Sequence, residues 1–204
     1  MTQEDSGSSV PSGLLAPHQV REIQESYLER TRPVMIIGPM AAGKSYLGLN
    51  LARFYGYEFL DSDQLISQLY GPIDQIFQER GEAAFRQLES QVIAQVLADP
   101  ARRNTIFSLG GGAPMTPAVA RLLAKETVIY VQVDAATVAP RLNRGKGRPL
   151  LQDDPLARWS QIFDARRARY EELASYTLDA RGGRSLTQMT AELQDFILSS
   201  RKGN

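Results

Sequence analysis

Short, continuously apolar runs alternate along this chain with longer stretches in which apolar residues recur every three or four positions. Runs of the first kind are typical of strands covered on both faces, and stretches of the second kind are typical of amphipathic helices. The predicted strands are 34–37, 58–60, 105–109, 127–133 and 176–178. The predicted helices are 46–55, 64–79 with a break near Gly71-Pro72, 81–98, 117–124, 135–143, 154–174 and 186–199. This alternation predicts an α/β fold of three layers, in which helices cover both sides of a five-stranded parallel sheet.

The first of these helices, 46–55, has a clear apolar side. Leu47, Leu51 and Phe54 share that side, and we expect it to be buried against the sheet. Gly56 should end the helix, because glycine takes the left-handed cap conformation without strain.

The first 31 residues differ in composition from the rest of the chain. Residues 1–16 are rich in Ser, Gly, Pro and acidic groups, which predicts disorder. Residues 17–30 have apolar positions near helical spacing and are compatible with a short helix. We therefore divide the chain into an N-terminal extension, 1–31, and a single domain, 32–204, whose size suits one hydrophobic core.

The composition excludes several classes of function. The 23 basic and 23 acidic residues give a formal net charge of zero, which argues against nucleic-acid binding as the main task. There is no cysteine, so disulfides and thiolate metal sites are absent, as expected for a cytoplasmic protein. The single histidine, His18, lies in the extension, which excludes a Ser-His-Asp triad inside the domain. Because the domain has neither cysteine nor histidine, any general base in it is expected to be a carboxylate. No apolar run approaches the roughly 20 residues that span a bilayer.

The segment Gly38–Ser45, GPMAAGKS, joins the first predicted strand to the first predicted helix. It matches G-x-x-x-x-G-K-S, and a strand, a tight turn and a helix form the context in which this pattern binds phosphate. Backbone N–H groups in such a loop point inward at phosphate oxygens, aided by the positive end of the helix dipole. We expect Lys44 to reach the β- and γ-phosphates and the Ser45 hydroxyl to bind Mg²⁺. The alternative is a glycine-rich turn without a ligand.

Phosphoryl transfer requires charge neutralisation and positioning, so carboxylates near this loop are the next candidates. Asp61 and Asp63 follow the strand 58–60, and their spacing lets both point toward one cleft at the strand end. The alternative is a helix cap, since Asp and Ser cap helices well and Asp63 precedes Gln64 at a helix start. The residues themselves leave both interpretations open.

Three further features are ambiguous by themselves. Arg86 lies at helical spacing from Glu82 and Glu89, which is typical of an ion pair on a helix surface. The glycine run 110–112 indicates unusual backbone conformation or close approach of a ligand. The basic segment 141–148 is either a solvated loop or a lid that brings arginines over a triphosphate.

Together these features resemble the shikimate kinase family over about residues 33–200. The matching segments are GPMAAGKS, FLDSDQLI, IFQERGEAAFRQLE, SLGGGAP, GRPLL and RRARYEELA, in this order along the chain. The P-loop is shared by many kinases, whereas DSD, GExxFRxxE, GGG and RPLL in this order are far more specific. The resemblance implies a P-loop kinase architecture, like that of nucleoside-monophosphate kinases, with a mobile lid at about 143–155.

The resemblance also implies how the acceptor is bound. Asp63 resembles the residue that binds the substrate hydroxyls and accepts the proton of the attacking one. Arg86 and Arg166 resemble the pair that holds the substrate carboxylate, and paired guanidinium groups suit a planar carboxylate. We choose Arg166 over the adjacent Arg167 because it lies four residues before Tyr170, as in the family. The backbone wall against the substrate ring is implied to be Gly110, Gly111 and Gly112.

The nucleotide and metal sites follow in the same way. Ser45 and Asp61 resemble the pair that organises one Mg²⁺ ion per subunit, and Lys44 and the lid residue Arg148 resemble the groups that act on the transferring phosphate. Arg141 matches the arginine that lies on adenine, and Arg184 stands on the other side of that pocket. The implied nucleotide-binding residues are Gly38, Ala41, Ala42, Gly43, Lys44, Ser45, Tyr46, Arg141, Arg148 and Arg184.

The chain departs from the family pattern at three places. Ala41 stands where the family often has glycine, and Tyr46 where it often has Thr or Ser. The loop 181–185 around Arg184 matches poorly. We expect the first two departures to affect nucleotide affinity.

The activity implied is the ATP-dependent phosphorylation of the 3-hydroxyl of shikimate, which gives 3-phosphoshikimate and ADP in aromatic amino-acid biosynthesis. The implied partners are ATP and this small polyhydroxy acid, without nucleic acid or membrane, and the expected state is a monomer. One alternative is a related kinase for another hydroxy acid such as gluconate. Another is a catalytically silent nucleotide-binding relative, whose mark would be loss of Lys44, Asp63 or Arg148, and all three are present. A motor NTPase would carry an acidic residue where the third strand instead runs into Leu109-Gly110.

Overall fold

The computed structural model describes residues 32–142 and 154–202. The N-terminal extension and most of the segment assigned to the lid, with Arg148, lie outside the described residues, as does His18.

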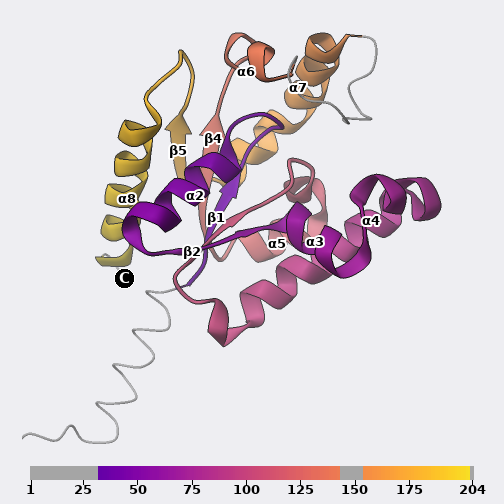
Figure 1. The fold of residues 1–204 in the computed structure, drawn as a ribbon, viewed down its shortest axis with the longest axis horizontal. Coiled ribbons are helices and arrows are strands. Elements are labelled where there is room, and N and C mark those ends of the chain that lie inside the picture. Colours follow the sequence, from indigo (N-terminus) through magenta and orange to yellow (C-terminus); the bar gives the residue numbers. More distant parts are fainter. Residues whose placement is uncertain (1–31, 143–153, 203–204) are drawn as a thin grey trace, which may run out of the picture.

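The described strands form one five-stranded parallel sheet, as the apolar runs predicted (Figure 1). Their order across the sheet is β2-β3-β1-β4-β5, so β1 lies at the centre, between β3 and β4. Ile36 in β1 is in register with Ser108 on one side and with Ile129 on the other. The strands are β1 Val34–Ile37, β2 Glu58–Asp61, β3 Thr105–Ser108, β4 Thr127–Gln132 and β5 Tyr176–Asp179.

Helices connect the strands and cover both faces of the sheet. They are α2 Lys44–Tyr55, α3 Ser62–Tyr70, α4 Ile73–Ala98, α5 Pro117–Leu123, α6 Ala135–Leu142, α7 Pro155–Leu173 and α8 Leu186–Lys202. Two short 3₁₀ turns accompany them, at Pro100–Arg102 and Ala113–Met115. The predicted break near Gly71-Pro72 separates α3 from α4, and α4 is kinked at Gly81, where φ is 79°.

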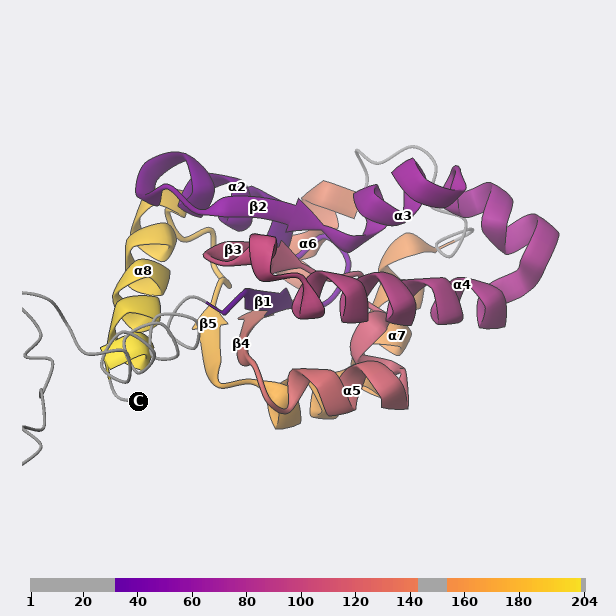
Figure 2. The ribbon, with the colours of Figure 1, turned by 90° about the horizontal axis from the view of Figure 1, so that it is seen from below.

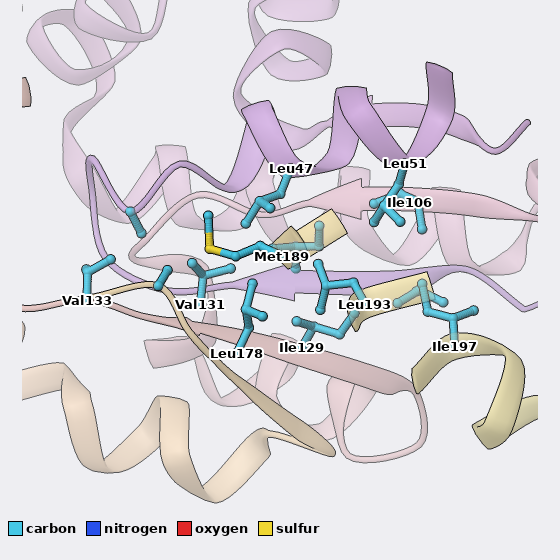
Figure 3. Packing of buried hydrophobic residues seen from close by; sticks show 14 of the residues in the cluster. Leu47, Leu51, Ile106, Ile129, Val131, Val133, Leu178, Met189, Leu193 and Ile197 are labelled. Atoms are coloured by element: carbon cyan, nitrogen blue, oxygen red, sulfur yellow. The ribbon is translucent and has the colours of Figure 1, made fainter. Parts of the chain in front are cut away.

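Alternate residues of β1, β3 and β4 enter two separate cores. In β1, Val34 and Ile36 face the core under α2, α6 and α8, whereas Met35 and Ile37 face the core under α4, α5 and α7. Figure 3 shows the first core, in which Leu47 and Leu51 of α2 meet side chains of the sheet and of α8. This two-sided burial explains why the strands read as continuous apolar runs.

A third, smaller core joins α3 to α4. It contains Ile66, Ile76, Phe85 and Val92, all nearly inaccessible to solvent. Figure 2 shows α3 and the first part of α4 projecting away from the sheet. This unit therefore carries Asp63 and Arg86 on a body that packs largely on itself.

One predicted core residue lies on the surface. Phe54 is 62% exposed, although Leu47 and Leu51 on the same helix are buried as expected. The twelve residues of α2 span about 18 Å, whereas a four-residue strand spans about 13 Å, so the last turn of α2 overruns the sheet. Arg53 covers the exposed ring instead, with its guanidinium 5.7 Å from the ring centre.

Within the described residues, no helix is both long enough and apolar enough to cross a membrane.

Candidate active site

The candidate site lies at the carboxyl ends of the three neighbouring strands β1, β2 and β3. The segment 38–45 follows β1, Asp61 ends β2, and the glycine run 110–112 begins two residues after β3. In open α/β sheets this edge is where ligands bind. The parallel pairing thus brings together three motifs that are far apart in the sequence.

The P-loop backbone takes conformations that side chains disfavour. Gly38 and Gly43 have φ of 143° and 94°, which glycine adopts freely. Ala41 has φ of 64°, in the left-handed region, and among the described non-glycine residues it shares a positive φ only with Asn104. Ala41, one of the departures from the family pattern, is therefore a point of backbone strain.

Every carbonyl from Gly38 to Gly43 accepts a hydrogen bond. The Lys44 ammonium donates to the carbonyls of Gly38 and Pro39, at 3.0 and 2.9 Å. Arg141 of α6 donates to the two alanine carbonyls of the loop, at 2.9 and 3.2 Å, and the main chain completes the set at Gly43. The Met40 carbonyl accepts from the indole Nε1 of Trp159 in α7, at 2.9 Å.

This pattern determines where the amide groups point. In a trans peptide the C=O of one residue and the N–H of the next point in opposite directions, and none of the described peptides is cis. Side chains of α7 and α6 bind the Met40 and Ala42 carbonyls, so the N–H groups of Ala41 and Gly43 that follow them point the other way, toward the inside of the loop. The Ala42 N–H instead donates to the Pro39 carbonyl, at 3.3 Å. The result is a cradle of donors suited to phosphate oxygens.

Lys44 lies beside this cradle, and the pKa of its ammonium group is shifted. Burial lowers the pKa of its ammonium group to about 8, and the negative charges of Asp63 and Asp61 oppose that shift. Its present partners are neutral carbonyls, so an anionic phosphate is a stronger partner for the protonated form.

Asp61 combines the two roles that the sequence left open. Its Oδ1 accepts from the backbone N–H groups of Asp63 and Gln64, at 3.0 and 3.4 Å, and so caps α3. Its Oδ2 accepts from the Ser45 hydroxyl at 2.8 Å. The suggestion that Asp63 caps the helix is wrong, because Asp63 lies inside the first turn and leaves its carboxylate available to the cleft.

Ser45 and Asp61 thus place a hydroxyl and a carboxylate oxygen side by side next to the phosphate cradle. Hard oxygen donors of this kind suit Mg²⁺, which keeps water and phosphate oxygens as its other ligands. Within the part of the chain that the structure describes, no cluster of three or more His, Cys, Asp or Glu side chains offers a metal site. A two-residue site fits an ion that arrives with a nucleotide.

Asp63, in the first turn of α3, is exposed to solvent, although protein also surrounds much of its carboxyl group. This surrounding protein raises the pKa of its carboxyl group, as does the charge of Asp61. Lys44 and Arg86 lie near enough to oppose the shift. A carboxylate with a raised pKa is a better proton acceptor than one in water.

Arg86 is held by two carboxylates of its own helix. Its Nη1 donates to Glu89 at 2.7 Å and its Nη2 to Glu82 at 3.2 Å. The sequence predicted both partners, but it placed the ion pair on the helix surface, and this is wrong for Glu89, which is fully buried. Among the described residues, its second oxygen, Oε1, has no hydrogen-bond partner. Burial raises the pKa of Glu89 to about 7, against the opposing charge of Arg86.

The glycine run is required by these charged groups. A Cβ on Gly110 would lie 2.7 Å from Glu89 Oε1 and 2.8 Å from Asp63 Oδ1. A Cβ on Gly112 would lie 2.2 Å from the Arg86 guanidinium. Both glycines therefore let charged side chains press against the main chain.

The remaining contacts of the run fix its position. A Cβ on Gly111 would lie 3.3 Å from the Gly38 carbonyl, so this residue borders the P-loop. The Gly110 N–H donates to the hydroxyl of Ser62, a fully buried residue, at 2.9 Å. The Gly111 carbonyl accepts from the Tyr170 hydroxyl at 2.5 Å.

The adjacent arginines of α7 point in different directions. Arg166 lies with Met40 and Tyr170 around a small cavity beside the P-loop, and its charge acts on Glu89. Arg167 pairs instead with Glu171 on the surface, at 2.7 Å.

Five of the ten predicted nucleotide-binding residues line a second cavity. A pocket of about 490 Å³ between the P-loop and the loop after β5 is lined by Ala42, Gly43, Tyr46, Arg141 and Arg184. Arg184 is oriented by the Glu192 carboxylate, at 2.6 Å. The apolar lining of the pocket comes from residues that the motifs did not indicate: Leu47, Ala180, Leu186 and Met189.

Comparison with known proteins agrees with this arrangement. The family model for shikimate kinase matches residues 40–197. The chain belongs to the shikimate kinase family.

Curated members of the family are similar over most of their length. The shikimate kinase of Corynebacterium diphtheriae is 38% identical over 82% of this chain and 96% of its own. That of Corynebacterium efficiens is 35% identical over 79% of this chain and 95% of its own. A solved structure of the Acinetobacter baumannii shikimate kinase in complex with shikimate is 31% identical, covers 83% of this chain and 94% of its own, and superposes with a TM-score of 0.76.

Sequence reasoning missed several residues of this shikimate kinase site. Three helical side chains form hydrogen bonds to loops of the site, although nothing in the sequence distinguishes them from other residues of their helices: Ser62, Trp159 and Tyr170. Their partners lie 48, 119 and 59 positions away in the chain. The only signal available was the polar atom on each otherwise core-like side chain.

Proposed function

We propose that this chain transfers the γ-phosphoryl group of ATP to the 3-hydroxyl of shikimate, giving 3-phosphoshikimate and ADP. Family membership over residues 40–197 supports this proposal, as does the similarity to an enzyme solved in complex with shikimate. The observation that carries it is the location of Asp63. Its carboxylate lies close enough to the P-loop lysine, Lys44, and to the guanidinium of Arg86 for both charges to act on it.

The nucleotide occupies the P-loop side. Its phosphates lie in the cradle of N–H groups beside Lys44, and its base enters the 490 Å³ pocket between Arg141 and Arg184. The apolar lining of that pocket suits the face of a purine, and the two guanidinium groups can lie against its ring. Lys44 holds the negative charge of the β- and γ-phosphates.

Ser45 and Asp61 hold one Mg²⁺ ion per subunit with their adjacent oxygens. When bound, the ion neutralises charge on the β- and γ-phosphate oxygens. Asp61 also caps α3, so the same side chain connects the phosphate site to the helix that carries Asp63.

The acceptor occupies the side formed by α3, α4 and α7. Arg86 and Arg166 bind its carboxylate, and Asp63 accepts a hydrogen bond from the attacking hydroxyl and takes its proton during transfer. The Gly110–Gly112 main chain borders the substrate ring. The raised pKa of Asp63 suits the proton transfer, because the free carboxylate holds a proton more tightly than in water.

We also propose that the Arg148 guanidinium binds the transferring phosphate. It lies outside the described residues, and its role rests on the segment GRPLL. We further propose that the chain acts as a monomer.

Release of ADP, measured side by side with shikimate, quinate and gluconate, tests the proposal. We expect turnover with shikimate that requires Mg²⁺ and exceeds turnover with the other two acids by at least about 100-fold, since their hydroxyl patterns leave polar groups of the site unpaired.

Each of the other possible results of this assay would reject a specific part of the proposal. Turnover with gluconate alone would reject the substrate assignment while keeping the kinase assignment. Binding of ATP without turnover of any acid would show a silent nucleotide-binding relative. Full activity without Mg²⁺ would reject the role of Ser45 and Asp61.

A further inference from the structure

Trp159 is the only tryptophan of the chain, and it contacts the P-loop directly. The residue is 3% exposed, and its ring stacks on Phe163 with the ring centres 4.9 Å apart. A buried indole of this kind fills space in most proteins, but here its N–H reaches the main chain of a loop 119 residues earlier. The contact couples α7 to the phosphate cradle.

The atom that Trp159 binds is significant for the nucleotide. It is the carbonyl of Met40, and the next N–H in the chain belongs to Ala41. Because the peptide between them is planar and trans, holding the carbonyl outward turns the Ala41 N–H inward. The indole thus acts on a phosphate donor without approaching the phosphate itself.

Ala41 is also the residue of the loop that most needs support. Its φ of 64° is unfavourable for a residue with a Cβ. The two peptide groups that flank it are both anchored from outside, one by Trp159 through the Met40 carbonyl and the other by Arg141 through the Ala41 carbonyl. Without these anchors the alanine would relax toward negative φ and rotate its N–H away.

We propose that Trp159 is a positioning residue for the phosphate cradle, which holds the Met40 carbonyl so that the strained Ala41 presents its N–H to the nucleotide. This inference rests on the proposed function only in that the P-loop binds a nucleotide. It requires neither shikimate nor catalysis.

Calorimetric titration with ADP, without any acceptor, tests the inference. Trp159→Phe keeps an aromatic ring against Phe163 and removes the N–H donor. We expect it to weaken ADP binding about five- to ten-fold, the factor that corresponds to one lost hydrogen bond. In kinetics the KM for ATP should rise by a similar factor, while the KM for shikimate stays within about two-fold.

A rescue variant separates positioning from packing. Ala41→Gly removes the preference for negative φ, so in the Trp159→Phe background it should restore at least half of the lost affinity on a logarithmic scale. A merely structural role of Trp159 predicts no recovery. The matched control is Phe163→Leu, which disturbs the same stacked pair but removes no hydrogen bond to the loop. It should lower Tm while leaving ADP affinity within about two-fold.

The fluorescence of the wild-type chain gives an independent readout, because all indole emission comes from Trp159. Phosphate binding to the Ala41 N–H strengthens the Met40 carbonyl as an acceptor. ADP should therefore shift the emission, whereas adenosine, which lacks phosphate, should not.

Three results would overturn the inference: equal ADP affinity in Trp159→Phe and wild type, no recovery with Ala41→Gly, or an equal emission shift with adenosine. Failure of the wild-type chain to bind ADP would overturn it together with the proposed function. A wild-type chain that binds ADP but does not phosphorylate shikimate would reject only the proposed function.

Discussion

The nucleotide half of the site is made mainly of main-chain groups, whereas the acceptor half is made mainly of charged side chains. In the nucleotide half, Lys44, Arg141 and Trp159 bind the carbonyls of the P-loop and so orient its N–H donors. In the acceptor half, Asp63 and Arg86 press against a main chain that has no side chains.

This difference indicates where the chain tolerates substitution. Every residue except proline supplies an N–H group, so the cradle keeps its donors although Ala41 and Tyr46 depart from the family pattern. The acceptor half depends on the identity of each charge. Glu89 is buried with one oxygen unpaired, and Arg86 is its charged partner. Loss of one member of such a pair leaves an uncompensated charge.

The largest effect is expected in the nucleotide half, at the P-loop lysine. Lys44→Ala should lower kcat by at least about 10³-fold, because no other described group supplies positive charge at the β- and γ-phosphates. Initial rates of ADP release measure the effect, with Tm as the control for folding. Activity within ten-fold of wild type would contradict the P-loop assignment.

In the acceptor half, the sharper change is Arg86→Lys, because Arg86→Ala would also strand the buried Glu89. Lysine keeps the charge but loses the planar fork, so the KM for shikimate should rise about 10- to 100-fold while the KM for ATP changes little. Arg167→Lys is the matched control on the surface of α7 and should leave both values unchanged. Equal effects of the two variants would reject the assignment.

The buried carboxylate predicts a pH dependence of stability. The pKa of Glu89 in the folded state is about 7, above the ordinary 4.5, so the folded state binds more protons between these values than the unfolded state does. Its contribution therefore lowers the free energy of unfolding as pH rises from about 4.5 to about 7, on the order of 3 kcal/mol at most.

Glu89→Gln removes this titration and can still accept a hydrogen bond from Arg86. Denaturant unfolding at pH 5 and pH 8 should show a smaller loss of stability with pH in the variant than in wild type. Identical pH dependences would show that Glu89 does not titrate in this range.

The smallest effect is expected in the nucleotide half, at Ala41. Ala41→Gly should raise the free energy of unfolding by about 1 kcal/mol, because glycine takes the left-handed conformation without strain. Ala42→Gly is the matched control: its φ is not positive, so the same change should destabilise by about 1 kcal/mol. Thermal unfolding distinguishes the two, and shifts in the same direction would argue against strain at Ala41.

Much of the fold could be predicted because its signals are local. The apolar runs and helical periodicities predicted the strands and helices to within a few residues, and Gly71 and Gly81 interrupt the helices where expected. Phe54 was the exception, since its exposure depends on how far the sheet extends beneath α2. Local sequence contains no information on that length.

The motifs of the site could be predicted from the sequence, but several side chains that contact them could not. The P-loop, the two aspartates and the glycine run come together at the ends of neighbouring strands, as parallel pairing requires. The burial of Glu89 and the contact of Trp159 with the Met40 carbonyl were not predicted, because each depends on an element distant in sequence.

By itself the sequence determined the family, the order of strands and helices along the chain, and the chemical groups available to the site, because motifs and periodicity are properties of neighbouring residues. Only the tertiary structure decided that Asp61 rather than Asp63 caps α3, that Glu89 is buried beside Arg86, and that Trp159 holds the P-loop. These outcomes depend on which face of each helix meets the sheet. The packing of the whole chain determines which face this is, so it cannot be predicted from any short segment.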